Sequence, residues 1–322
     1  MTQLRFTLLG LFTLAVLAGC KPKDAPAPGT SVTNPDGTTS LADARKGFTT
    51  KLAKQQKSGE PVDEPPAKLF RKVQYDAPVG KCAAYLTPDP KDGKKHPAIV
   101  WITGGDCNTI DKGAWAAGRP DNDQSARQYR DAGIVMMFPS LRGGNQNPGV
   151  KENFYGEVDD VLAAAGYLAK QEYVDPNRIY LGGHSTGGTL VMLVAEVPNK
   201  FRAVFSFGPV NTITNYGGQF TEAVNTDDPR EVELRNPGKW LHSVQCPTFV
   251  FEGDQRGNLS SLQAMAESST NPKAKFYPVK RAGHFSILAP VNKLIAQKIL
   301  TDTGAETNLS FTEAELNKLF GG

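Results

Sequence analysis

The feature that most constrains the fold is an alternation of apolar, strand-like runs with helix-period segments between residues 69 and 300. Several of the runs are continuous and rich in Val, Ile and Phe, which is typical of parallel strands covered on both faces. The alternation predicts an α/β fold: a mainly parallel sheet with right-handed crossovers and helices on both faces. Eight strands are expected, at residues 72–76, 81–87, 97–103, 134–140, 178–183, 203–208, 247–253 and 274–279. The first two are too close together for an intervening helix, so we expect an antiparallel hairpin at one edge.

Length, composition and net charge limit the classes of protein to which the chain can belong. The chain has 322 residues, 39% of them hydrophobic, which is enough to bury a full core. Its 36 basic and 33 acidic residues leave a net charge of only +3, which gives no support for a nucleic-acid partner. No cysteine or histidine cluster has the spacing of zinc ligands, so we expect neither a metal nor another cofactor.

The N-terminus predicts export. Residues 6–17 are an almost unbroken apolar run after one positive charge, too short to span a bilayer comfortably, so residues 1–19 are expected to be a signal peptide. The sequence Leu-Ala-Gly-Cys at 17–20 resembles a bacterial lipobox, in which Cys20 is lipidated and becomes the mature N-terminus. Lys21 after the cysteine, by resemblance to Gram-negative lipoproteins, favours the outer membrane. The alternative is an ordinary secretory signal in which Cys20 has no role.

Three further segments set the expected domain organisation. Residues 20–67 are predicted to be a flexible tether, rich in Pro, Gly, Ser and Thr up to residue 40, followed by a short, weakly amphipathic helix at residues 41–59. Residues 68–322 are predicted to be the folded domain. Within that domain, residues 211–242 are too long and polar for a simple connection, which predicts a lid or substrate-binding insertion. Its aromatic residues Tyr216, Phe220 and Trp240 either line a pocket or pack in the core.

Apart from Cys20, the chain has three cysteines, Cys82, Cys107 and Cys246. An exported protein meets an oxidising compartment, so one disulfide among them is expected. Connectivity cannot be read from a sequence. We favour the pair Cys82–Cys107, because both residues flank the same early part of the sheet.

The motif Gly-His-Ser-Thr-Gly at residues 183–187 predicts a nucleophile, Ser185. It follows a predicted strand and opens an apolar helix, the strand–turn–helix setting that such a serine requires. Glycines on either side let the strand and the helix approach closely around the strained turn. The alternative is a small serine in an ordinary tight turn.

A serine hydroxyl needs a base to become a good nucleophile, and the chain has only four histidines. His284 follows the last predicted strand and precedes the last helix of the sheet region, so its loop returns to the carboxyl edge where Ser185 is expected. His184 adjoins the serine and should turn away from its hydroxyl. His96 is expected at the surface, and His242 has no evident role. We therefore predict that His284 is the base.

The segment from Ser140 to Gly188 resembles the α/β-hydrolase fold. More narrowly, it is similar to the catalytic domain of prolyl oligopeptidase-type serine hydrolases and the dienelactone hydrolase group. The matching parts are Arg142-Gly143, Asp159-Asp160, residues 175–178 and the serine motif. The resemblance covers roughly residues 70–300, and the order serine, acid, histidine fits it. It implies a structural pair between Arg142 and the two aspartates. Residues 21–68 are too few for the β-propeller that gates prolyl oligopeptidases, which favours a small ester substrate over a peptide.

Of the three residues of the expected catalytic triad, the acid is the one that the sequence specifies least. It should follow the strand at 247–253, but in the family it often lies a few residues further on, where this chain has Arg256. Asp254 is the nearest carboxylate and is our prediction. Glu252, Asp227 and Asp228 are the alternatives, together with no acid at all.

Two backbone amides are expected to stabilise the oxyanion. The first belongs to Thr186, at the N-terminus of the helix that follows the serine. The second belongs to Gly105 or the neighbouring Asp106, because a Gly-Gly pair ends the strand at 97–103. The alternative is a plain glycine turn.

The sequence therefore predicts an exported, lipid-anchored serine hydrolase that cleaves a carboxylic ester or an amide through an acyl-enzyme. Its partners would be a small ester or peptide substrate and, through Cys20, the membrane. A serine peptidase similar to prolyl oligopeptidase is the first alternative. A binding lipoprotein that keeps the hydrolase fold without turnover is the second, and the missing acid at Arg256 motivates it.

Overall fold

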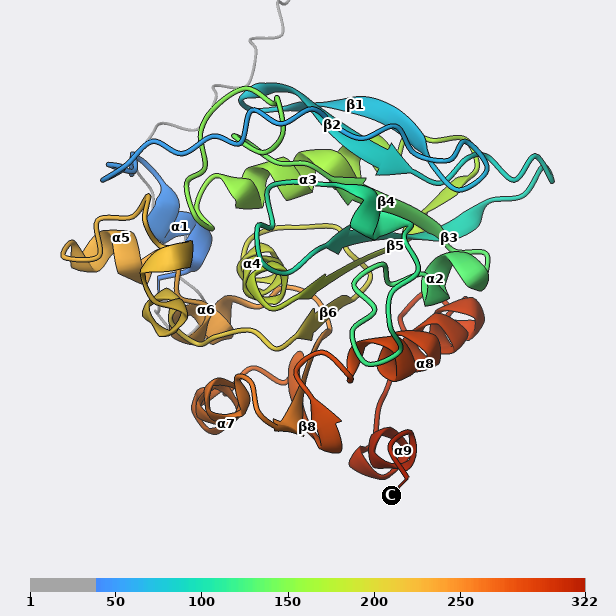
Figure 1. Ribbon diagram of the computed structural model, residues 1–322. Coiled ribbons are helices and arrows are strands. Elements are labelled where there is room, and N and C mark those ends of the chain that lie inside the picture. The colour runs from blue at the N-terminus through green and yellow to red at the C-terminus, as the bar shows by residue number, and fades with distance from the viewer. Residues whose placement is uncertain (1–38, 322) are drawn as a thin grey trace, which may run out of the picture. The chain divides into compact units, whose positions relative to one another are not determined.

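One eight-stranded sheet runs through residues 39–321, the part of the chain that the computed structural model describes (Figure 1). The predicted signal peptide and Cys20 lie outside these described residues. The strand order across the sheet is β1-β2-β4-β3-β5-β6-β7-β8. The strands are β1 Arg71–Ala77, β2 Gly80–Leu86, β3 His96–Ile102, β4 Val135–Pro139, β5 Val174–His184, β6 Val204–Phe207, β7 Thr248–Gln255 and β8 Ala274–Gly283.

The sheet is parallel from β4 to β8, and β2 pairs antiparallel with both β1 and β4. The predicted mainly parallel sheet and its edge hairpin are confirmed. Because β3, β5, β6 and β7 are parallel neighbours, their carboxyl ends meet at one edge, where a parallel sheet places its ligands. The loops after β3, β5 and β8 carry the residues that the sequence singled out.

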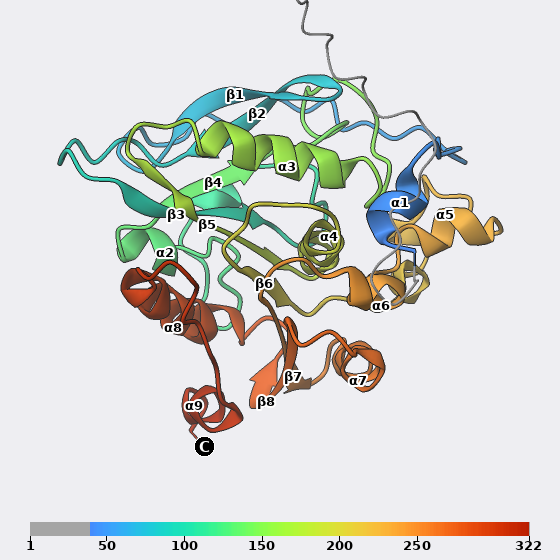
Figure 2. The ribbon, with the colours of Figure 1, turned by 180° about the vertical axis from the view of Figure 1, so that it is seen from behind.

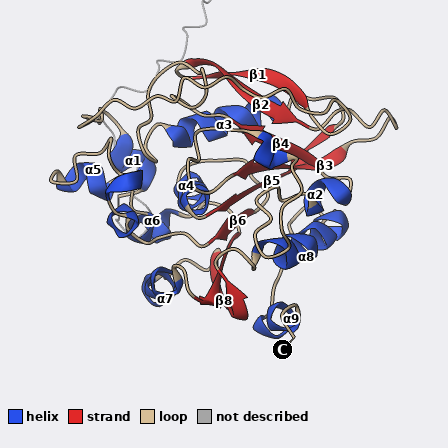
Figure 3. Cartoon of the chain, viewed as in Figure 1, coloured by secondary structure: helices blue, strands red, loops and turns tan. Residues whose placement is uncertain are grey.

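Helices cover both faces of the sheet (Figures 2 and 3). Buried side chains of α3 and α4 pack on one face, and those of α2, α8 and α9 pack on the other. None of the described helices is both long and apolar enough to cross a bilayer. The helices are α1 Leu41–Arg45, α2 Gln128–Asp131, α3 Glu157–Leu168, α4 Thr186–Ala195, α5 Pro229–Glu233, α6 Pro237–Trp240, α7 Leu259–Ser268, α8 Leu288–Thr301 and α9 Glu313–Lys318.

The helix expected at residues 41–59 is much shorter in the structure, and residues 20–38 of the predicted tether lie outside the described residues. Helix α1 ends at Arg45, and residues 46–60, called the N-terminal arm here, continue without a further α-helix. The arm is held by backbone hydrogen bonds: Ala53 N–H donates to Ala223 O at 2.8 Å, and Ser58 N–H donates to Gly143 O at 2.8 Å. Its order depends on backbone partners far along the chain, which its own weak apolar pattern does not reveal.

The insertion at residues 211–242 consists of short helical pieces between β6 and β7. It meets the N-terminal arm through a β-bridge between Leu52 and Val224. Trp240 is a core residue, since it is buried and its indole N–H donates to Glu233 O at 2.8 Å. Phe220, in contrast, faces cavities beside Ser185.

The three described cysteines, Cys82, Cys107 and Cys246, are buried free thiols. The predicted Cys82–Cys107 disulfide is therefore wrong. Cys82 lies on β2 and Cys107 follows β3, and the strand order places β4 between these two strands. Nearness in the sequence thus did not give nearness in the sheet.

A buried ion pair joins the loop after β4 to α3. The Arg142 guanidinium donates from Nε and Nη2 to Asp160, each at 2.9 Å, and its Nη1 donates to Glu152 at 2.6 Å. The Asp160 side chain is fully buried, whereas Asp159 is 47% exposed and pairs with Arg45. The pairing of Arg142 with the two aspartates that the family resemblance implied is confirmed for Asp160 and wrong for Asp159.

We predict unequal costs for the two neutralised aspartates. Asp160→Asn leaves Arg142 buried without its main partner and should lower the free energy of unfolding by about 3–5 kcal/mol. Asp159→Asn removes a half-exposed pair and should cost about 1 kcal/mol or less. Urea unfolding followed by tryptophan fluorescence measures both, and equal losses would contradict the assignment.

Candidate active site

Ser185 lies at the turn between β5 and α4, with backbone angles φ 55° and ψ −116°. This conformation is strained for a residue with a side chain. The flanking glycines are required by space: a Cβ on Gly183 would lie 2.5 Å from Gly187 O, and a Cβ on Gly187 would collide with Ile102 O. The structure therefore has the tight strand–turn–helix geometry that the motif predicted.

His284 and Glu252 form a hydrogen-bonded pair beside this turn. His284 Nδ1 lies 2.8 Å from Glu252 Oε2, and the Glu252 side chain is fully buried. Glu252 also accepts hydrogen bonds from the backbone N–H groups of Gly253 and Asn258. Gly208 makes room for the pair, since a Cβ there would lie 2.5 Å from the His284 ring and 2.7 Å from Glu252 Oε2.

Asp254 does not contact His284, so its predicted place beside the histidine is corrected to Glu252. The β7–β8 pairing shifts register between Gly253 and Gln255, and such an irregularity redirects side chains. Asp254 is exposed and accepts a hydrogen bond from the backbone N–H of Arg281 at 2.8 Å.

The two remaining carboxylate candidates lie in the insertion. Asp228 is the N-cap of α5, where its side chain accepts from Arg230 N–H at 2.9 Å. Asp227 is exposed. Neither makes the contact with His284 that Glu252 makes.

The predicted oxyanion residues lie next to each other. Thr186 is the first residue of α4, so its N–H is one of the helix donors without an intrahelical acceptor. Its hydroxyl donates to Gly105 O at 2.9 Å, which ties the loop after β3 to the helix start. A Cβ on Gly104 would lie 3.1 Å from Ser185 Cβ, so this loop passes directly by the serine.

Tyr216 of the insertion lines the cavity that contains Ser185 and His284. Its hydroxyl lies 2.7 Å from Thr189 Oγ1, in the wall of this cavity. Thr189 Oγ1 in turn accepts from the backbone N–H of Val210 at 3.0 Å. Burial raises the pKa of Tyr216 well above its usual value, so the phenol stays a neutral donor. The sequence indicated only a pocket-lining or core residue here.

His184 supports the loop that carries His284. Its ring is fully buried, and its Nε2 lies 3.0 Å from His284 O, to which an Nε2–H would donate. Burial, together with the charge of nearby His284, lowers the pKa of His184 to about 3, so the ring is neutral at physiological pH. The sequence predicted that the His184 side chain turns away from the serine hydroxyl. Its contact with the His284 carbonyl fits this prediction.

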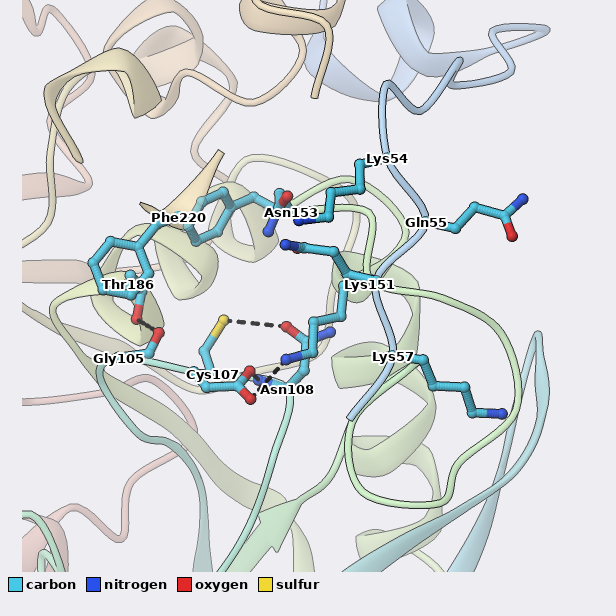
Figure 4. A pocket seen from close by; sticks show the side chains of 13 residues that line it. Lys54, Gln55, Lys57, Gly105, Cys107, Asn108, Lys151, Asn153, Thr186 and Phe220 are labelled. Atoms are coloured by element: carbon cyan, nitrogen blue, oxygen red, sulfur yellow. Dashed lines mark hydrogen bonds and ion pairs between the residues drawn. The ribbon is translucent and has the colours of Figure 1, made fainter. Parts of the chain in front are cut away.

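Three cavities lie at the serine turn, and two of them contain Ser185. One, of about 580 Å³, contains both Ser185 and His284, with Tyr216 and Asn258 in its wall. A second, of about 740 Å³, is lined by Gly104, Gly105 and Ser185. The third, of about 550 Å³, includes Gly105 and Thr186 (Figure 4). Among residues 39–321, no group of three or more His, Cys, Asp or Glu side chains could hold a metal ion.

Comparison with known proteins shows the family to which the chain belongs. The model of the prolyl oligopeptidase family matches residues 121–287, a segment that contains the serine turn, Glu252 and His284. The chain belongs to the prolyl oligopeptidase family. It is therefore a serine hydrolase, and the curated proteins that it matches in part include a dipeptidyl-peptidase and an S-formylglutathione hydrolase.

Two curated relatives match only in part. The chain is 27% identical over 202 residues to dipeptidyl-peptidase 5 of Porphyromonas gingivalis, which covers 56% of this chain and 28% of that protein. It is 27% identical over 195 residues to S-formylglutathione hydrolase of Bos taurus, covering 50% and 65%. A puromycin-hydrolysing peptidase of Mycobacterium tuberculosis superposes with a TM-score of 0.58 at 18% identity, over 72% of this chain and 39% of that one. This last likeness shows the shared α/β-hydrolase fold.

We predict a specific pH dependence of stability from His184. In the unfolded chain this residue takes up a proton near pH 6.5, whereas the folded protein resists protonation down to about pH 3. The unfolded state therefore binds more protons between these values, and stability falls as the pH falls. Between pH 7 and pH 5, the wild type should lose about 2 kcal/mol more than His184→Gln. Urea unfolding at both pH values measures the difference, and parallel losses would contradict it.

Proposed function

We propose that Ser185, His284 and Glu252 form the catalytic triad of this serine hydrolase. The observation that carries the proposal is the buried Glu252 carboxylate 2.8 Å from His284 Nδ1, in a histidine that shares a cavity with Ser185. A proton on Nδ1, donated to Glu252, leaves the Nε2 lone pair free. His284 Nε2 then takes the Ser185 proton as the hydroxyl attacks a carbonyl carbon, and Glu252 stabilises the imidazolium that forms.

The negative charge that develops on the carbonyl oxygen needs donors that are already in place. The N–H groups of Thr186 and Gly105 are the proposed donors, supported by the contact between these two residues. Tyr216 adds a neutral hydroxyl to the wall of the cavity that contains Ser185. If the Thr189 hydroxyl donates to Tyr216, the Tyr216 O–H is free to donate toward the reacting centre.

The reaction has two stages. Breakdown of the first tetrahedral intermediate transfers the proton from His284 to the leaving group and leaves an acyl-Ser185 ester. Water, deprotonated by His284, then attacks this ester and releases the acid. The complete Ser185–His284–Glu252 set argues against the non-catalytic alternative, because the missing acid that motivated it is supplied by Glu252.

We propose a carboxylic ester as the substrate class, with a peptide as the alternative. The partial match to S-formylglutathione hydrolase supports the former, and the partial match to dipeptidyl-peptidase 5 supports the latter. Parallel screens of 4-nitrophenyl esters and aminoacyl 4-nitroanilides separate them by which class is cleaved. The lipobox sequence at residues 17–20 further supports a place in the cell envelope, anchored through Cys20, which fractionation of expressing cells would test.

We predict that the two acids at the end of β7 have very different importance. Glu252→Gln keeps the size of the side chain but no longer stabilises the His284 imidazolium, so kcat on a 4-nitrophenyl ester should fall by about a hundredfold or more. Asp254→Asn is the matched control, because Asp254 is exposed and bonds only to backbone in this region. Its kcat should stay within about twofold of the wild type.

Ser185→Ala gives the baseline for this comparison, since it removes the nucleophile and should leave no enzyme-dependent turnover above background. If Asp254→Asn loses activity while Glu252→Gln retains it, the assignment of the acid is wrong. If Ser185→Ala keeps full activity, the whole triad is wrong.

A further inference from the structure

A basic cavity opens directly beside the proposed oxyanion donors (Figure 4). It has a volume of about 550 Å³, and its wall includes Gly105 and Thr186. Three lysines line it, Lys54 and Lys57 from the N-terminal arm and Lys151 from the loop after β4, whereas Asp106 is the one acidic residue in the lining. The cavity wall therefore carries an excess of positive charge next to the reacting serine.

The three lysines differ in how far they are neutralised. Lys151 Nζ lies 2.7 Å from Asp106 Oδ2, inside the cavity wall. Lys54 Nζ lies 2.8 Å from Glu222 of the insertion. Lys57 forms no ion pair with any of the described residues 39–321, and its side chain is exposed. An unpaired ammonium in a walled cavity attracts an anion more strongly than one on an open surface.

Backbone hydrogen bonds hold the segments on which these lysines lie. On one side of the cavity, Ala53 N–H donates to Ala223 O. On the other, Lys151 N–H donates to Gln56 O at 2.9 Å, and Gly59 N–H donates to Asn145 O at 2.7 Å. The arm thus runs from the insertion to the loop after β4 and places Lys54 and Lys57 at the cavity.

The position of His284 indicates which part of a substrate would occupy the basic cavity. His284 must deliver a proton to the leaving group, so the leaving group belongs to the cavity that contains His284 and Ser185. The basic cavity contains neither of these residues but does contain Gly105 and Thr186. It therefore lies on the side of the acyl group.

We infer that the basic cavity is a subsite for a carboxylate carried on the acyl part of the substrate. The inference rests on the proposed function, since it assigns a substrate class to the same serine. The best substrates are then monoesters of dicarboxylic acids, or acyl groups with an acidic side chain. Phe220 and Phe154 in the wall would contact the apolar chain between the two carbonyl groups.

The test compares two esters that differ in one charge, mono-4-nitrophenyl adipate and its neutral methyl ester. The measured quantity is the ratio of their kcat/KM values, corrected for spontaneous hydrolysis. The wild type should prefer the anionic ester, and raising the salt concentration from 50 to 500 mM should reduce this preference because ions screen the lysines. This readout needs no variant and does not depend on the folding of a mutant.

Substitutions of single lysines then test which positive charge recognises the substrate carboxylate. Lys57→Gln should lower the anionic-to-neutral ratio by about threefold, and Lys57→Glu by about tenfold, as expected for one partly exposed ion pair lost and then reversed. Lys275→Gln is the control, because Lys275 is an exposed lysine on β8 that does not line this cavity. It should leave the ratio unchanged.

Turnover of the neutral ester without any preference for the anionic one would overturn the subsite and leave the triad intact. An unchanged ratio in Lys57→Glu would also overturn it. Failure of the wild type to cleave either ester would instead contradict the proposed function, and the subsite would fall with it.

Discussion

The buried ion pair between Arg142 and Asp160 is the interaction on which the surroundings of the site depend. It fixes the loop after β4 to α3, and the Arg142 carbonyl accepts a hydrogen bond from the Asn108 side chain at 2.8 Å. Asn108 belongs to the segment after β3 that begins with the glycines beside Ser185. The Gly143 carbonyl of the same loop holds the N-terminal arm through Ser58. One buried charge pair thus orders the oxyanion side of the site and the arm that carries the lysines.

The second constraint is space at the carboxyl edge of the sheet. The serine turn is strained and closes only because Gly183 and Gly187 have no side chains, and the His284–Glu252 pair fits only because residue 208 is a glycine. Buried His184 then binds the backbone of His284. Ser185, His284 and Glu252 are therefore positioned by the packing around them, and the free energy for the strain comes from the core on both sides of the sheet.

The sequence predicted what depends on strand order and local turn chemistry. The parallel sheet, the edge hairpin, the serine turn and the return of His284 to the same edge all follow from the alternation of strands with helices and from one glycine-rich motif. Asp254 was the wrong first choice for the carboxylate beside His284, and the alternative Glu252 takes that place, because the β7–β8 pairing shifts register after Gly253 and no residue type announces this shift. A useful sign was nevertheless present: Glu252 interrupts an apolar strand, and a buried carboxylate requires a partner.

Two other expectations failed because they depend on contacts between distant parts of the chain. The Cys82–Cys107 disulfide assumed that early strands are neighbours, whereas β4 inserts between them. The helix expected at residues 41–59 ends at Arg45, and the backbone of residues 53–59 instead hydrogen-bonds with residues 143–151 and 223. Contacts between distant parts of the chain also place Tyr216 in the wall of the cavity that contains Ser185, and the lysines in the wall of the basic cavity.

The measurement that tests the central claim most directly is mapping of a covalent adduct. The protein is treated with a fluorophosphonate, which reacts with an activated serine, and the modified peptide is identified by mass spectrometry. We predict one adduct per chain, on Ser185, formed much more slowly in His284→Ala and absent from Ser185→Ala. An adduct on another serine, or the same extent of labelling in Ser185→Ala, would contradict the account.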